Sequence, residues 1–323
     1  MARNTTYYFS RMGAFRIGTS GWHYPKGRGT WNGIFYALPE DRERGFDELR
    51  FYAERFNTVE VNSTFYGQPR AHVTLGWAKR TPRDFEFAVK LFQKFTHPNL
   101  SIDQTPVTQS DIDAFRGGID PLAAAGKLGP LLVQFPSSFQ RTAESVDYLG
   151  WLLRTLGDYA LAVELRHRSW SDSPATATLL ETGNAAWVQI DEPKFSSSIR
   201  QDLKGSGDVY YLRLHGRNAA QWWDHAEPED RYNYFYSTEE LEPIAAAVRR
   251  FVTPAARPEG GPAIAKKAYL FLNNHFSAQA VANATTLKHM LDEPVPARMP
   301  PELIERFPDL AGIVATLPRA RLI

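Results

Sequence analysis

The feature that most constrains this chain is a regular alternation of short apolar runs with amphipathic stretches. Eight runs rich in β-branched and aromatic residues indicate strands, at 16–22, 58–65, 85–92, 130–135, 161–167, 186–191, 209–215 and 269–275. Helical spacing of apolar residues lies between them, at 43–57, 69–80, 110–126, 142–157, 174–183, 238–252 and 277–291. Only the link 192–208, polar and rich in Ser and Gly, lacks a clear helix. Such alternation predicts right-handed parallel βαβ units.

Eight strands favour a closed barrel over an open sheet, which usually has about five or six strands. A nucleotide-binding open sheet is disfavoured, because no Gly-x-Gly-x-x-Gly follows the first strand and no Walker A loop occurs. We therefore expect a single α/β domain of the (β/α)8 TIM type over 15–323. Residues 1–14 are expected to be a disordered extension, and the Pro-rich segment 292–323 to pack across the outside or base of the barrel.

Composition limits the classes of function. The 37 basic and 36 acidic residues nearly cancel, so no global field attracts nucleic acid. The absence of cysteine excludes disulfides, thiolate metal sites and a Cys nucleophile. The sequence shows neither a signal-peptide core nor an apolar run of the roughly 18 residues that a spanning helix needs. A cytoplasmic protein without membrane contact is the expectation, and the oligomeric state stays open.

One face of the predicted strands becomes polar toward the C-terminal end. In 58–65, for example, Val59 and Val61 alternate with Glu60 and Asn62. Such a layer inside a barrel is unfavourable unless it is paired or hydrated, and the sites of TIM-type enzymes lie at strand C-termini. The pattern therefore favours a functional pocket over the alternative, a buried ion-pair network. The predicted inward residues are Glu60, Asn62, Lys90, Gln134, Glu164, Arg166, Asp191, Arg213, His215 and Asn273.

Several segments together resemble a known family, the YecE-like proteins, a domain of unknown function (family 72). The matching stretches include GTSGWHYPKGRGTWNGIFY (18–36), TVEVNSTFYGQP (58–69), AVELRHRSW (162–170), YYLRLHGR (210–217) and YLFLNNHFSAQA (269–280). The resemblance implies a TIM-type barrel and leaves the activity open. This chain has His275 where the family usually has an acidic residue after two asparagines.

Carboxylates are the first candidates for chemistry. Glu60, Glu164 and Asp191 are predicted catalytic residues, since paired carboxylates perform acid/base work. Glu164 ranks first because Arg166 and His167 follow it closely. The alternative is that neighbouring cations neutralise all three as salt bridges.

Cations, amides and rings are the predicted substrate-binding residues. Three buried cations require carboxylates or an anionic ligand, and a guanidinium binds phosphate or carboxylate through two hydrogen bonds. Amide side chains orient hydroxyls, and aromatic rings after strand ends stack on a ligand or, alternatively, hold loops in place. The predicted set is Trp22, Asn62, Tyr66, Lys90, Gln134, Arg166, Arg213, His215 and Asn273.

A metal site is an alternative use of the same positions. His215 and His275, with a carboxylate, would suit a divalent metal, but no HxH, HxxxH or HExxH spacing occurs. Ordinary hydrogen bonding of these histidines is favoured, so we predict no metal ligand and no cofactor, with a divalent metal as the alternative.

Three functions follow in order of preference. The first is an enzyme of the hydrolase, lyase or isomerase type that performs acid/base chemistry on a small anionic substrate, similar to a sugar phosphate or nucleotide. The second is metal-assisted phosphodiester hydrolysis on nucleic acid, which the balanced charge disfavours. The third is a non-catalytic ligand-binding barrel.

Overall fold

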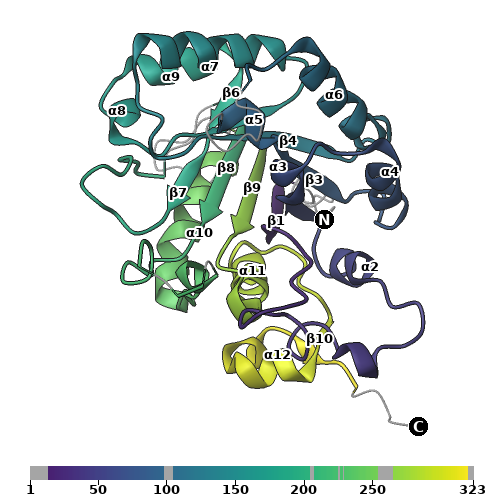
Figure 1. The fold of residues 1–323 in the computed structure, drawn as a ribbon. Coiled ribbons are helices and arrows are strands. Elements are labelled where there is room, and N and C mark those ends of the chain that lie inside the picture. The colour runs from purple at the N-terminus through teal and green to yellow at the C-terminus, as the bar shows by residue number, and fades with distance from the viewer. Residues whose placement is uncertain are drawn as a thin grey trace, which may run out of the picture.

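The computed structural model describes residues 14–97, 105–203, 207–224, 226–227, 229–253 and 265–318. They form a mixed α/β fold with parallel strands (Figure 1). The predicted extension 1–14 lies outside the described residues except for Ala14, whose carbonyl accepts a hydrogen bond from the Ala268 amide at 2.7 Å. None of the helices in the described part of the chain is long and apolar enough to cross a membrane.

The predicted strands are all present, divided between two parallel sheets. One sheet has the order β2 (Thr58–Val61), β3 (Glu86–Lys90), β4 (Leu128–Gln134), β5 (Leu161–Glu164) and β6 (Ala185–Trp187). The other has the order β1 (Phe15–Thr19), β9 (Lys267–Leu272), β8 (Val209–Leu214) and β7 (Gln189–Asp191). The predicted strand 186–191 corresponds to β6 and β7 together, because its first half pairs with β5 and its second half with β8.

The junction between β1 and β2 has no regular hydrogen-bond ladder. A single parallel bridge joins Ser20 to Glu60. Beside it, the hydroxyl of Tyr52, from α2 (Glu48–Ala53), accepts from the Thr19 amide at 2.8 Å and donates to the Thr58 carbonyl at 3.1 Å. An uninterrupted ladder is therefore absent here, because a side chain takes the place of direct backbone pairing.

A second side chain and a glycine complete this junction. Asn57 accepts from the Ile17 amide at 3.2 Å and donates to the Phe15 carbonyl at 3.0 Å. A Cβ on Gly18 would lie 2.2 Å from the Thr58 carbonyl oxygen. Only glycine therefore allows the two sheets to approach this closely.

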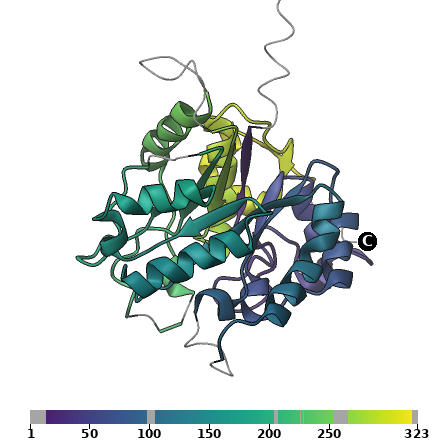
Figure 2. The same cartoon turned by 90° about the horizontal axis from the view of Figure 1, so that it is seen from above.

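Helices lie around the outside of the strands (Figure 2). The seven predicted helices are all present among the described residues, the first of them shorter than expected. They are α2, α4 (Ala71–Lys79), α6 (Gln109–Ala124), α7 (Ala143–Thr155), α9 (Ala175–Thr182), α10 (Thr238–Val252) and α11 (Gln279–Met290). Short helices α3 (Ser63–Tyr66), α5 (Gln93–Thr96) and α8 (Arg168–Ser171) follow strand ends, whereas residues 192–203 form no helix.

The described part of the Pro-rich segment packs against α11. Its elements are β10 (Arg298–Met299), α12 (Pro301–Arg306) and β11 (Ala315–Thr316), and Figure 1 shows α12 and β10 beside α11. Residues 280–288 of α11 are all buried as a consequence.

The N-terminal end of the strands carries its own ion cluster. Glu86 accepts hydrogen bonds from Lys267 at 2.8 Å, from Arg16 at 2.9 Å and from the hydroxyl of Tyr269. Burial opposes ionisation, but the hydrogen bonds from Lys267 and Tyr269 and the nearby Arg16 hold the pKa of Glu86 below its ordinary value. The charges of this cluster are therefore paired with one another at the N-terminal ends of β1, β3 and β9.

Candidate functional site

A cavity of about 240 Å³ lies at the C-terminal ends of the strands, and we call it the strand-end pocket. Its wall includes seven of the nine predicted substrate-binding residues, together with two tyrosines and a histidine from the surrounding loops. The lining residues are Tyr24, Asn62, Tyr66, Lys90, Gln134, Arg166, Arg213, Tyr232, Asn273 and His275.

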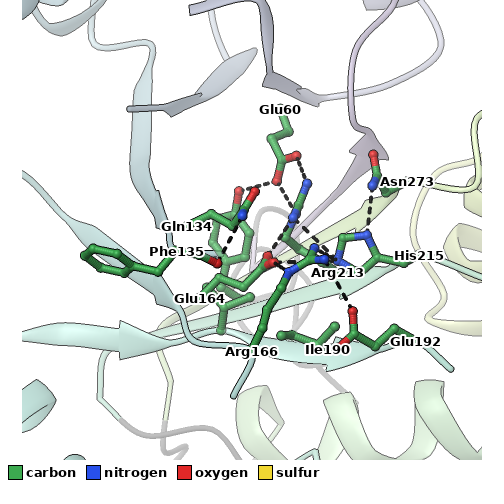
Figure 3. A network of polar contacts seen from close by, with 12 residues as sticks. Glu60, Gln134, Phe135, Glu164, Arg166, Ile190, Glu192, Arg213, His215 and Asn273 are labelled. Atoms are coloured by element: carbon green, nitrogen blue, oxygen red, sulfur yellow. Dashed lines mark hydrogen bonds and ion pairs between the residues drawn. The ribbon is translucent and has the colours of Figure 1, made fainter. Parts of the chain in front are cut away.

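Arg213 is the centre of a buried ion-pair network under this pocket (Figure 3). Its side chain is 3% exposed, and its Nη2 and Nε donate to the two oxygens of Glu60 at 2.7 and 3.0 Å. Its Nη1 donates to Glu164 at 2.6 Å. The two carboxylates outweigh the effect of burial and raise the pKa of Arg213, so the guanidinium is permanently charged.

The two glutamates are fully engaged behind the pocket wall. Glu164 also accepts from Nε of Arg166 at 2.6 Å, and Glu60 accepts from the Tyr211 hydroxyl at 2.8 Å. Burial alone would raise the pKa of Glu164, but Arg213 and Arg166 hold it well below its ordinary value. Neither carboxylate lines the pocket. The geometry therefore favours salt bridging for Glu60 and Glu164, which the sequence analysis gave as the alternative to a catalytic role.

His215 extends the network as a neutral ring. Its Nε2 accepts from Nη2 of Arg166 at 3.2 Å, and its Nδ1 lies 2.8 Å from the Asn273 amide (Figure 3). Burial, and then the charges of Arg213 and Arg166, lower the pKa of His215 well below its ordinary value. Since Nε2 accepts, the proton of the neutral ring belongs on Nδ1. A half-turn of the Asn273 amide would present its oxygen to that proton.

Lys90 differs from the other two cations of the pocket. Its Nζ lies 4.0 Å from the centre of the Phe65 ring. Within the described residues this amine makes neither a hydrogen bond nor an ion pair. Burial, followed by the charge of Arg213, lowers the pKa of Lys90 from 10.5 to about 7. Near neutral pH, a large fraction of this amine is therefore unprotonated.

Aromatic residues form the outer part of the wall. His275 stacks on Tyr24, with ring centroids 4.4 Å apart, and contacts the tilted ring of Tyr232 at 4.7 Å. Burial lowers the pKa of His275 to about 4, so the ring is neutral, and its buried Nδ1 has no partner among the described residues. Tyr66, in contrast, is 77% exposed at the pocket mouth.

His215 and His275 do not form a metal-ligand set with a carboxylate in this arrangement. His275 is held among tyrosines, while His215 contacts Arg166 and Asn273. In the part of the chain that the structure describes, no three His, Asp or Glu side chains gather as a metal site requires.

Two predicted site residues lie away from the pocket. Asp191 accepts from Arg217 at 2.8 Å and from the Tyr236 hydroxyl at 2.7 Å, outside the network. Trp22 packs edge-on against Trp77, with ring centroids 5.6 Å apart. Neither residue lines the strand-end pocket, so their predicted placement was wrong.

The inward carboxylate on this strand is Glu192, which the sequence reasoning missed. It is 7% exposed, and one of its oxygens lies 3.6 Å from Nη1 of Arg166. Burial raises the pKa of Glu192, although Arg166 opposes the effect. The rule that apolar residues face outward failed here, because Ile190 and Glu192 share the inner face and Asp191 the outer one. Tyr211 was missed too, although it alternates in step with Arg213.

Fold and site together define a parallel α/β protein with a cationic pocket at the strand ends. Residues 16–304 match the family described as "Protein of unknown function DUF72", and the chain belongs to that family. It is 28% identical over 289 residues to the UPF0759 protein YunF of Bacillus subtilis, covering 85% of this chain and 94% of that protein. Similarity to the UPF0759 protein YecE of Escherichia coli K12 is 30% over 135 residues, or 41% and 46% of the two chains.

A solved structure supports the same assignment. The crystal structure of a DUF72 family protein from Thermotoga maritima is similar, with a TM-score of 0.70 and 33% identity, covering 86% of this chain and 99% of that one. The predicted resemblance to the YecE-like family is thus confirmed. The family description assigns no activity.

Proposed function

We propose that this protein is an enzyme that acts on a small anionic substrate in the strand-end pocket. One observation carries the proposal: three basic side chains, those of Lys90, Arg166 and Arg213, line the pocket, and none of the described carboxylates does. The glutamates stand behind Arg166 and Arg213, where they orient the guanidiniums without filling the pocket. A ligand in the pocket therefore contacts the guanidinium groups, while the two glutamates behind them stay out of its reach.

Arg166 is the principal anion-binding residue in this proposal. Its side chain is 21% exposed, whereas that of Arg213 is 3% exposed. Its Nε and Nη2 are held by Glu164 and His215, which leaves Nη1, 3.6 Å from Glu192, as the end most available to a ligand. A fixed guanidinium binds phosphate or carboxylate with little loss of side-chain entropy.

Size and lining narrow the substrate class. Ligand pockets usually measure about 300–1,000 Å³. The strand-end pocket, at about 240 Å³, therefore suits a small molecule. Tyr24, Tyr66 and Tyr232 supply ring faces and hydroxyls, and Asn62 Oδ1 is buried without a partner among the described residues. These groups suit a compound with hydroxyls beside its anionic group, such as a sugar phosphate.

We also propose that the two sheets form one closed (β/α)8 barrel. The bridge between Ser20 and Glu60 supports closure on one side, and the continuous chain from β6 to β7 on the other. In such a barrel the pocket occupies the end where TIM-type enzymes bind their substrates.

Calorimetric titration with inorganic phosphate and glucose 6-phosphate tests the proposed substrate class. We expect both to bind the wild-type protein, the sugar phosphate more tightly, and Arg166→Met to lose most of this affinity. The matched control is Arg168→Met, because Arg168 pairs with Asp172 at the surface, two residues away. Equal affinity of Arg166→Met and wild type would refute an anion site at Arg166.

A further inference from the structure

We propose that Lys90 is a catalytic nucleophile that forms a Schiff base with a small aldehyde or ketone carrying a phosphate or carboxylate. The inference rests on the proposed function, because the anionic group of the substrate is the part that Arg166 binds. It adds a covalent step and a carbonyl group to the substrate class.

The surroundings of Lys90 differ from those of lysines with structural roles in this chain. Lys127 donates to the carbonyls of Ala78 and Thr81 at 2.7 Å each, and Lys267 donates to Glu86 at 2.8 Å. Within the described residues, Lys90 makes no comparable bond and instead lies over an aromatic ring. A lysine with only a structural role would be expected to satisfy its three donors.

The position of the amine suits attack on a bound carbonyl. Lys90 ends β3 and lines the same small cavity as Arg166 and Arg213. A substrate whose anionic group contacts Arg166 therefore has its remaining atoms within a volume that Lys90 borders. Fixing both partners in this way supplies the proximity that a bimolecular addition lacks.

The electrostatics favour the reactive form of the amine. Desolvation and a neighbouring cation are the two means by which enzymes obtain an unprotonated lysine. Both act here: burial and the charges of Arg213 and Arg166 lower the pKa of Lys90, Glu164 and Glu60 partly oppose them, and the net pKa is about 7. His97, nearby, is neutral near pH 7, because burial and then Lys90 lower its pKa to about 4.

The proposed step balances without an oxidant or reductant. The lone pair of Nζ forms a bond to the carbonyl carbon, and the carbonyl oxygen takes up a proton to give a carbinolamine. This hydroxyl leaves as water after a second protonation, while a C=N⁺ bond forms. One of the two protons in the water comes from the amine and the other from solvent. The iminium then withdraws electrons from the adjacent C–H or C–C bond.

Reductive trapping tests this step. The intact protein is incubated with pyruvate or dihydroxyacetone phosphate and sodium cyanoborohydride, and the modified residue is identified by peptide mass spectrometry. We expect one adduct, on Lys90, for at least one of the two probes. Its rate of formation should rise through about pH 7, as the amine deprotonates. Lys266, which is 80% exposed and pairs with Asp208, does not line the pocket and should form no adduct above background.

Variants separate failure of this inference from failure of the proposed function. Lys90→Met should lose the adduct while it retains its fold, and phosphate binding is scored on the wild-type protein. Arg166→Met should bind phosphate poorly and form the adduct at least tenfold more slowly, whereas Lys266→Arg should behave as wild type. Phosphate binding by the wild type, with adducts scattered over exposed lysines or with none, would overturn the Schiff base alone. Loss of phosphate binding by wild type would overturn the proposed function itself.

Discussion

At the scale of single residues, the strand-end pocket divides its ionisable groups into two kinds. Arg213, Glu60 and Glu164 are mutually saturated and deeply buried, so they hold the geometry. Lys90 and the exposed edge of Arg166 remain for a ligand. A buried group with partners is costly to remove, whereas a buried group without partners is costly to keep. Stability measurements on variants can therefore distinguish the structural residues from the functional ones.

Removal of Arg213 should severely destabilise the protein. Arg213→Met leaves two buried carboxylates without their main counter-ion, and we expect the free energy of unfolding to fall by about 3–5 kcal/mol. Urea denaturation measures this change. The control is Lys266→Met, which breaks an exposed pair with Asp208 and should cost less than about 1 kcal/mol. Equal losses for the two variants would contradict the network as the core of the site.

Removal of Lys90 should stabilise the protein. Between the pKa of about 7 in the folded protein and the ordinary 10.5, the unfolded chain binds a proton that the folded chain does not, so stability rises with pH across this range. Below pH 7 the full penalty of charging this half-buried amine applies. At pH 6 we expect the free energy of unfolding of Lys90→Met to exceed that of wild type by about 1–3 kcal/mol. This difference should narrow toward pH 10. A destabilised variant, or a gap independent of pH, would contradict this electrostatic account.

At the scale of elements, the most informative junction lies between β1 and β2. The Tyr52 hydroxyl satisfies the buried backbone amide of Thr19 and carbonyl of Thr58, and therefore replaces part of a strand ladder. Helix α2 thus positions two strands as well as covering them.

Tyr52→Phe tests this role of a helix side chain. The substitution keeps the ring but leaves buried backbone groups without a partner, so we expect a loss of about 1–3 kcal/mol in the free energy of unfolding. Tyr66→Phe is the control, because Tyr66 is 77% exposed and its hydroxyl has no hydrogen-bond partner among the described residues. Thermal denaturation in which both variants match wild type would mean that the Tyr52 hydroxyl contributes nothing to the junction.

Sequence patterns predicted the helices and strands better than the contacts between them. Period-2 alternation located the strands and placed Lys90, Arg166 and Asn273 on the pocket wall, because strand geometry fixes side-chain direction locally. For Asp191 the alternation predicted the wrong face. Apolar Ile190 occupies the inner face of this strand, so the pattern of polar and apolar residues does not indicate which side chains point inward. The partners of each charge depend on long-range contacts, such as that of Glu60 with Arg213, which no local pattern contains.

At the scale of the whole molecule, closure of the two sheets determines whether the pocket is one rigid site. Gly18 lies where β1 approaches β2, and an added Cβ would meet the Thr58 carbonyl oxygen at 2.2 Å. If the sheets form one barrel, strain at this point must weaken the entire fold. If they are independent, it weakens only the local strand.

Gly18→Ala distinguishes these cases through hydrogen exchange. We expect amides in β1 and β2, and also in the distant β5, to exchange faster by a similar factor, since a closed barrel opens as one unit. Gly76→Ala, a helical position with open space around the added carbon, should not accelerate exchange in β5. Faster exchange confined to β1 after Gly18→Ala would contradict closure.

The most direct test of an anion-binding pocket is a crystal structure of the protein grown with phosphate. The account predicts phosphate in the strand-end pocket, with an oxygen within hydrogen-bond distance of Arg166 and the ion-pair network of Arg213 unchanged. A pocket that contains only water at saturating phosphate, with Arg166 in the same position, would contradict it.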